Sequence, residues 1–279
     1  DDVAEAIREK DGTTADIVAD TFPDRIRAIS SREGSVLNGT REWKQSNVTE
    51  GYAWAEYFSC LAHAGNIWLC ATSKGIFKSE AGMVWEKSLS GSGYNVCYGN
   101  GVWLATVGSS GPEGTGVYYS SDAVTWTRSL ANVYFRELIY ANGYFVGVGS
   151  KGIHRSVDGV TWEQVNTEST WRRVAYKDGT WVIAKANTSG TVHGLYYSKD
   201  NCSTISPCTI PSYAESGGGN VENGYRFVAA GENGWVAAGG FGTYGSPILY
   251  SANGISWNLS NVLKGRNIVT GFYADGKWV

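Results

Sequence analysis

Residues 156–162 read Ser-Val-Asp-Gly-Val-Thr-Trp, and this seven-residue frame recurs along the chain. We call it the heptapeptide motif. Close copies are Ser-Ser-Asp-Ala-Val-Thr-Trp at 120–126 and Ser-Ala-Asn-Gly-Ile-Ser-Trp at 251–257. Weaker copies occupy 79–85 and 198–204, and a degenerate one ends at Trp43. The copies end at residues 43, 85, 126, 162, 204 and 257, which predicts a repeat of about 40 residues.

A second motif, a tight turn followed by an aromatic residue, alternates with the first. It reads Asn-Gly-Val-Trp at 100–103, Asn-Gly-Tyr-Phe at 142–145 and Asp-Gly-Thr-Trp at 178–181. Looser copies end at Trp68, Trp235 and Trp278. Asn-Gly and Asp-Gly between apolar runs are strong β-hairpin signals, because both residues tolerate a positive φ. Each repeat therefore contains two turns between strands.

One repeat, residues 134–166, predicts four strands, at 135–140, 144–148, 152–156 and 161–165. Four short antiparallel strands in each repeat are typical of a β-propeller blade. The composition agrees, since the chain has 37 Gly for turns and 13% aromatic residues for strands. The sequence therefore predicts an all-β fold, a β-propeller.

The repeats also predict the domain organisation. Residues 1–23 are expected to be a helical lead-in or linker, and residues 24–279 the propeller. Residues 268–279 hold the start of a unit and residues 26–46 the end of one, so we expect six blades with the last shared by both termini. Five blades are the alternative. Complete units are expected to begin near Tyr57, Tyr94, Tyr134, Trp171 and Tyr225.

The heptapeptide motif resembles the Asp-box, or bacterial neuraminidase repeat, of a family of β-propellers. The resemblance implies that the motif forms the turn between the third and fourth strands of a blade. Its Asp would accept backbone hydrogen bonds from the turn, and its Trp would pack between blades. Both roles are structural. The residues concerned are Asp122, Trp126, Asp158, Trp162, Asn253 and Trp257.

Propeller geometry places the starts of the innermost strands on the same face as the variable loops at 110–115, 187–192 and 242–247. Aromatic residues stand beside arginines there. Aromatic rings stack on sugars and guanidinium groups bind carboxylates in pairs of hydrogen bonds, so an acidic glycan would suit this face. In the alternative interpretation the aromatics wedge between blades and the arginines only solvate the rim. The candidate ligand-binding residues are Tyr94, Tyr134, Arg136, Trp171, Arg172, Arg173, Tyr225, Arg226 and Arg266.

Several other classes of function find little support in the sequence. The net charge is −3 without a basic cluster, so no nucleic-acid partner is expected. No apolar run reaches 18 residues, which argues against membrane insertion. Neither a metal site nor a cofactor is expected, because ligand spacings and phosphate-binding loops are absent from the sequence. Cys60, Cys70 and Cys97 are expected to be buried thiols, while pairing of Cys202 with Cys208 stays open.

The function expected from these features is a non-catalytic recognition module. The sequence style is similar to propeller domains of phage tail receptor-binding proteins. That resemblance implies host attachment through a cell-surface glycan or a receptor protein, a place in the virion tail or outside the cell, and other tail subunits as further partners. A scaffold or assembly-factor propeller is the second hypothesis.

A sialidase-like glycoside hydrolase is the third hypothesis. Family resemblance implies that it would need three arginines on the substrate carboxylate, a Tyr nucleophile paired with Glu, and an acid/base Asp. Arg136, Arg172 and Arg226 come from successive units and would suit the arginines. The Arg-Ile-Pro signature of that family is replaced by Phe-Pro-Asp-Arg-Ile-Arg at 22–27. We therefore expect no enzymatic activity.

Overall fold

The computed structural model describes residues 58–108, 111–185, 194–211, 225–239, 248–260, 271, 273–274 and 277–278. All of them belong to the second of two compact units, Ser46–Val279. Every regular element in this part of the chain is a β-strand, so the all-β prediction is confirmed. The expected helical lead-in at 1–23, the domain boundary that follows it and the half-unit at 26–46 lie outside the described residues.

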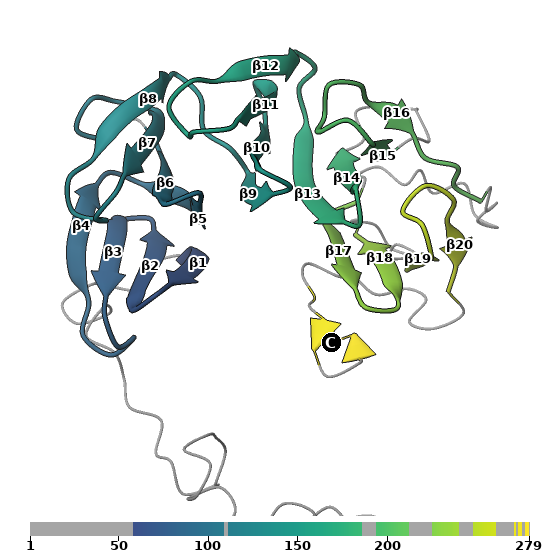
Figure 1. The fold of residues 1–279 in the computed structure, drawn as a ribbon, viewed down its shortest axis with the longest axis horizontal. Helices are drawn as coiled ribbons and strands as arrows, with labels where there is room; N and C mark the ends of the chain where they lie inside the picture. The colour runs from purple at the N-terminus through teal and green to yellow at the C-terminus, as the bar shows by residue number, and fades with distance from the viewer. Residues whose placement is uncertain are drawn as a thin grey trace, which may run out of the picture. The chain divides into compact units, whose positions relative to one another are not determined.

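The described strands form five antiparallel sheets of four, in chain order, and one hairpin (Figure 1). The first sheet holds β1 (Phe58–Ala64), β2 (Ile67–Thr72), β3 (Gly75–Ser79) and β4 (Glu86–Ser90). The second holds β5 (Gly93–Gly99), β6 (Val102–Val107), β7 (Gly116–Ser120) and β8 (Thr127–Ala131). The third holds β9 (Glu137–Ala141), β10 (Tyr144–Gly149), β11 (Gly152–Ser156) and β12 (Glu163–Asn166). The fourth holds β13 (Trp171–Lys177), β14 (Thr180–Lys185), β15 (Leu195–Ser198) and β16 (Ser206–Pro207), and the fifth β17 (Phe227–Gly231), β18 (Gly234–Ala238), β19 (Leu249–Ser251) and β20 (Asn258–Leu259). The hairpin pairs β21 (Tyr273–Ala274) with β22 (Lys277–Trp278).

The residues of the turns explain where each first strand ends and each second strand begins. Asn100, Asn142 and Asp178 begin the turns between the first and second strands, with φ of 47°, 50° and 46°. These left-handed values are the ones that Asn, Asp and Gly tolerate best. In residues 134–166 the strands agree with the prediction to within two residues at each end. The largest differences are that the first and fourth strands begin at Glu137 and Glu163, each two residues later than expected.

The heptapeptide motif forms the turn between the third and fourth strands. The Asp158 Oδ1 atom accepts hydrogen bonds from the N–H groups of Val160 and Thr161, both at 2.8 Å. The Ser156 hydroxyl donates to the same oxygen at 3.0 Å. Asp122 and Asn253 make the equivalent pairs of bonds in their own turns. The side chain thus satisfies N–H groups that the turn would otherwise leave unpaired.

The tryptophan of the motif links its sheet to the preceding one. The Trp126 Nε1 atom donates to the Ser88 hydroxyl in the first sheet at 2.8 Å. Trp162 repeats this contact with Ser129 of the second sheet at 3.1 Å. One short motif therefore both closes a turn and joins two repeats.

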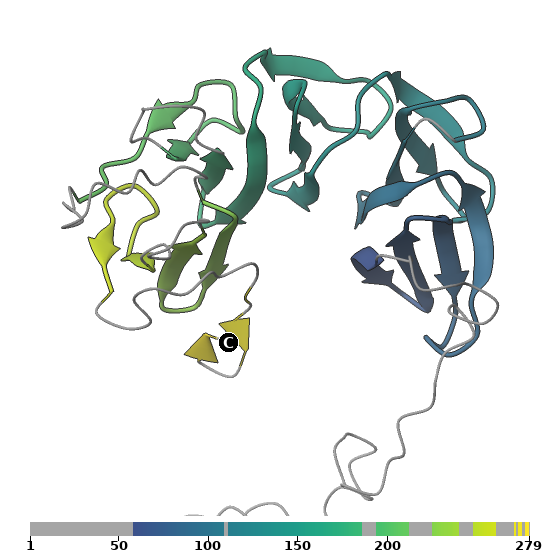
Figure 2. The same cartoon turned by 180° about the vertical axis from the view of Figure 1, so that it is seen from behind.

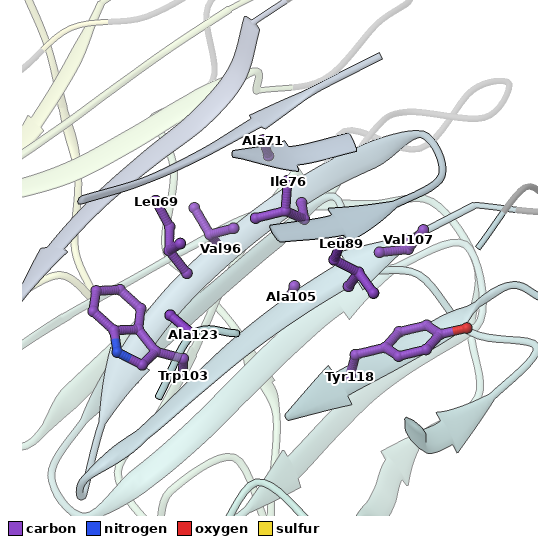
Figure 3. Close-up of a cluster of buried hydrophobic side chains, with 10 residues drawn as sticks. All are labelled: Leu69, Ala71, Ile76, Leu89, Val96, Trp103, Ala105, Val107, Tyr118 and Ala123. Atoms are coloured by element: carbon purple, nitrogen blue, oxygen red, sulfur yellow. The ribbon is translucent and has the colours of Figure 1, made fainter. Parts of the chain in front are cut away.

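The core lies between successive sheets. Figure 3 shows one cluster, in which Leu69, Ile76 and Leu89 of the first sheet meet Val96 and Trp103 of the second. Three further clusters join the second sheet to the third, the third to the fourth and the fourth to the fifth. Because the middle strands are covered on both faces, they are apolar almost throughout, as in the buried pattern of β6.

The five cysteines are all free thiols. Cys202 lies in the cluster between the third and fourth sheets and Cys208 in the cluster between the fourth and fifth. Burial raises the pKa of each thiol to about 12. The two residues therefore act as separate core side chains and do not form a disulfide.

The first strands of the sheets form a continuous series. β1 contacts β5, β5 contacts β9, β9 contacts β13 and β13 contacts β17, and the hairpin strand β21 contacts β17 in turn. Figure 2 shows the same strands from behind. Residues at equivalent positions of these strands are consequently brought toward one another.

Candidate anion-binding site

The strand registers define one position that is repeated in all five sheets. In β1, β5 and β13 the pairing with the second strand shifts at a β-bulge, which leaves Ser59, Tyr94 and Arg172 as the extra residues. Arg136 and Arg226 lie at the matching place, one residue before β9 and β17, and their N–H groups bond to Val148 O and Ala238 O. Bulges redirect a side chain away from the regular pleat. We call these five residues the bulge position.

The side chains of all five bulge positions line one pocket of about 260 Å³. Arg173 is the sixth lining residue. Four of the six are arginines, contributed by the third, fourth and fifth sheets. The structure thus brings together Tyr94, Arg136, Arg172, Arg173 and Arg226 of the predicted site, in what we call the arginine pocket.

The arginines of this pocket influence one another electrostatically. Burial, together with the positive charges of Arg136, Arg226 and Arg173, lowers the pKa of Arg172. Burial and the charge of Arg173 lower the pKa of Arg226 as well. The buried Nε atom of Arg172 has no hydrogen-bond partner among the described residues. Clustered cations with an unused donor are the arrangement that an anionic ligand would relieve.

One aromatic residue, Tyr94, belongs to the lining of the arginine pocket. The rings of Tyr94 and Tyr134 are stacked, with centroids 4.5 Å apart and planes inclined by 17°. Tyr94 lines the pocket and is 39% exposed, whereas Tyr134 is not among the lining residues. The pocket therefore offers an aromatic surface beside its charged groups.

Trp171 and Tyr225, two other candidates, lie in the core instead. Trp171 is 1% exposed, packs edge-on against Tyr196 and donates from Nε1 to Asn166 Oδ1 at 3.1 Å. Tyr225 is 4% exposed, within the cluster between the fourth and fifth sheets. Both rings wedge between sheets, so we leave them out of the candidate site. Arg266 lies outside the described residues.

Sequence reasoning missed two residues of this region. Ser59 lines the pocket, and Glu137 lies directly after the bulge position of the third sheet. A count along the chain would have found Ser59, because each bulge position lies six residues before the first residue of its hairpin turn. Glu137 has no signal of this kind, since its importance depends on contacts with the next sheet.

Glu137 connects the third sheet to the fourth. Its Oε2 atom accepts a hydrogen bond from the Val174 N–H at 2.6 Å. Burial raises the pKa of this carboxyl group to about 7, although Arg173 and the Val174 N–H act in the opposite direction. A partly protonated carboxyl group therefore lies close to the arginine pocket at neutral pH.

Other kinds of site are not evident in the described part of the chain. It contains no group of three His, Cys, Asp or Glu side chains placed to hold a metal ion. Nor does any helix among these residues have the length and apolar character to span a membrane. The arginine pocket itself would repel a cation.

Comparison with solved structures fixes the fold class. The extracellular domain of the putative one-component system BT4673 from B. thetaiotaomicron superposes with a TM-score of 0.56 and 11% identity, over 83% of this chain and 32% of that chain. The WD40 domain of Pan2 from Neurospora crassa superposes with a TM-score of 0.53 and 9% identity, over 77% and 68%. The computationally designed protein Ika8 superposes with a TM-score of 0.51 and 13% identity, over 79% of this chain and 66% of that chain. The fold is that of a β-propeller.

These similarities concern the fold alone, because the identities are low and propellers serve many functions. The chain spans about a third of the BT4673 domain and about two thirds of Ika8. No family model and no curated protein matches the sequence. The function therefore has to be argued from the arginine pocket.

Proposed function

We propose that this propeller is a non-catalytic recognition module whose arginine pocket binds an anionic group of a cell-surface glycan or receptor. The observation that carries the proposal is the convergence of Arg136, Arg172, Arg173 and Arg226 from three successive sheets on one pocket. Guanidinium groups bind carboxylate, sulfate and phosphate oxygens through paired, charge-assisted hydrogen bonds. A ligand that carries such a group would offset the mutual repulsion of the four cations.

The size of the arginine pocket and the aromatic residue in its lining favour an acidic sugar. About 260 Å³ lies below the range of about 300–1,000 Å³ that drug-sized ligands occupy, so one terminal sugar residue is a suitable occupant. We infer that the exposed part of the Tyr94 ring contacts such a sugar while the arginines hold its charged group. We propose an acidic glycan on this basis.

The finer assignments belong to the same proposal. We place the chain with the Asp-box propellers because the Asp of the heptapeptide motif binds the N–H groups of its turn. We propose six blades because the β21–β22 hairpin contacts β17 as the first strand of a further unit would. Attachment of a phage tail to its host, with the chain in the virion tail or outside the cell, rests on the resemblance in sequence style.

A scaffold or assembly-factor propeller is the second candidate function. It is favoured by Met83, Val84 and Val124, which are 45%, 66% and 58% exposed at the turns of the first two sheets. They line a second pocket, of about 630 Å³. Another protein subunit could cover these apolar side chains, and an acidic glycan would gain little from them.

The proposal is tested by screening the purified chain on a glycan array and on whole cells, with release of free sialic acid followed in parallel. We expect saturable binding of acidic glycans, and a loss of about tenfold or more in Arg172→Gln because one charged contact is removed. Lys151→Gln is the matched control, since it removes an exposed positive charge outside the pocket.

The other outcomes would change either the place of the site or the function assigned to the chain. Glycan binding that Arg172→Gln leaves unchanged would move the site away from the arginine pocket. Binding to protein subunits without any glycan would favour the scaffold. Release of sialic acid would favour the sialidase-like hydrolase, our third hypothesis, over a purely binding module.

A further inference from the structure

Glu137 occupies a position whose side chains reach from one sheet to the next. The equivalent residue of the second sheet, Asn95, donates from Nδ2 to the Arg136 carbonyl oxygen at 3.1 Å. Glu137 in turn accepts the Val174 N–H at 2.6 Å. The first contact holds the backbone of a bulge position, and the second holds the backbone two residues after one. The Glu137 carboxyl group is thereby fixed against β13, where it interacts with Arg173.

Few charged groups of the described residues face this carboxyl group from the elements packed around it. Arg173 on β13 interacts favourably with it, and Arg136 is its neighbour in the chain. The Cys60 thiol on β1 also lies within electrostatic range. Burial raises the pKa of Cys60 further above its ordinary value, so this thiol stays neutral near pH 7. Glu137 is therefore an acidic group that responds to the charge of Arg173, a lining residue of the arginine pocket.

We propose that the arginine pocket takes up a proton at Glu137 when it binds its anion, so that the anion is held more tightly in mildly acidic than in mildly alkaline solution. The inference rests on the proposed function, because it concerns the regulation of the same pocket. Its structural basis is the Glu137 carboxyl group, which the Val174 N–H holds between β9 and β13 and which interacts with Arg173, a lining residue of the pocket.

The direction of the effect follows from the charges. Ionised Glu137 neutralises part of the positive charge of Arg173, which lines the pocket, and repels an incoming anion. Protonated Glu137 does neither, so binding is tighter below about pH 7, where the carboxyl group is neutral. A bound anion in turn favours the neutral carboxyl group, because coupling between two sites is reciprocal. If the anion raises the pKa of Glu137 by about one unit, the affinities on the two sides of neutrality differ by about tenfold.

Inorganic sulfate is a suitable probe, because its own charge is constant across neutral pH. We expect the full chain to bind sulfate about tenfold more tightly in mildly acidic than in mildly alkaline solution. Glu137→Gln should bind tightly at both pH values, since the amide cannot ionise. Glu86→Gln on β4 is the matched control and should retain the pH dependence of the unmodified chain.

Calorimetry on the unmodified chain gives a second readout that does not depend on a variant. Sulfate titrations near neutral pH in two buffers of different ionisation enthalpy measure the protons taken up on binding, and we expect net uptake. Sulfate binding without proton uptake and without pH dependence would overturn the coupling between the anion and Glu137. The arginine pocket would still stand as the binding site.

Two further outcomes separate this inference from the function it rests on. Proton uptake that persists in Glu137→Gln would assign the proton to another group and would also overturn the coupling. Absence of sulfate binding at every pH would remove the arginine pocket itself as a site, and with it the proposed function.

Discussion

Arg136 and Arg172 occupy the same position in two neighbouring sheets, and both line one pocket. Arg226 repeats the position in the next sheet, whereas Ser59 and Tyr94 hold it in the first two. In a repeat fold, arginines at the same position of separate units therefore come together as one cluster. The cluster is local, since the chain as a whole carries a net charge of −3. Such a concentration of cations around one pocket is what steers and binds an anion.

The first prediction concerns stability in the presence of an anion. Sulfate or an acidic oligosaccharide should raise the melting temperature of the chain, because a ligand that binds only the folded state stabilises it. At 100 times the dissociation constant the gain is about 2.7 kcal/mol. Thermal unfolding followed by tryptophan fluorescence measures the effect.

Variants of the pocket distinguish this gain from a general effect of salt. Arg172→Gln should melt at or above the temperature of the unmodified chain without anion, since it relieves repulsion, and should gain little from adding one. Lys151→Gln should gain as much as the unmodified chain. An equal gain in all three proteins would show that the anion acts elsewhere.

The second prediction is that Trp171 serves stability and not ligand contact. Its indole ring is 1% exposed between the third and fourth sheets. Truncation of a buried aromatic residue leaves a cavity, so Trp171→Ala should lower the free energy of unfolding by about 3–5 kcal/mol. Denaturant titration measures the loss. A variant with unchanged stability that no longer binds glycan would place the ring in the binding site instead.

The third prediction separates the charge of the heptapeptide motif from its hydrogen bonds. Asp158→Ala removes the acceptor for the Val160 and Thr161 N–H groups and should cost about 1–2 kcal/mol. Asp158→Asn should cost little, because Asn253 already makes the same two bonds with its side-chain oxygen. Equal losses in both variants, measured by denaturant unfolding, would show that the charge itself is required.

Local signals made the strands predictable, and the absence of such signals limited the prediction of the site. Asn-Gly turns and the heptapeptide motif act over a few residues, so the four strands of the third sheet could be placed to within two residues at each end. Which side chain faces the pocket depends on the bulges and on packing between sheets. Trp171 and Arg172 are adjacent in the chain, yet one is in the core and the other lines the pocket.

The fourth prediction concerns acid titration of Asp122. Hydrogen bonds from the Thr125 and Val124 N–H groups lower the pKa of this carboxyl group from 3.8 to about 2. A lowered pKa means that the ionised group stabilises the fold above about pH 4, and that this contribution is lost as the pH falls through about 2. Carbon-13 NMR of the side-chain carboxyl should show a midpoint near 2, and Asp122→Asn should make unfolding less dependent on pH in this window. A midpoint near 4 would mean that the turn bonds found in the structure do not persist in solution, and that the motif does not hold its turn through this carboxylate.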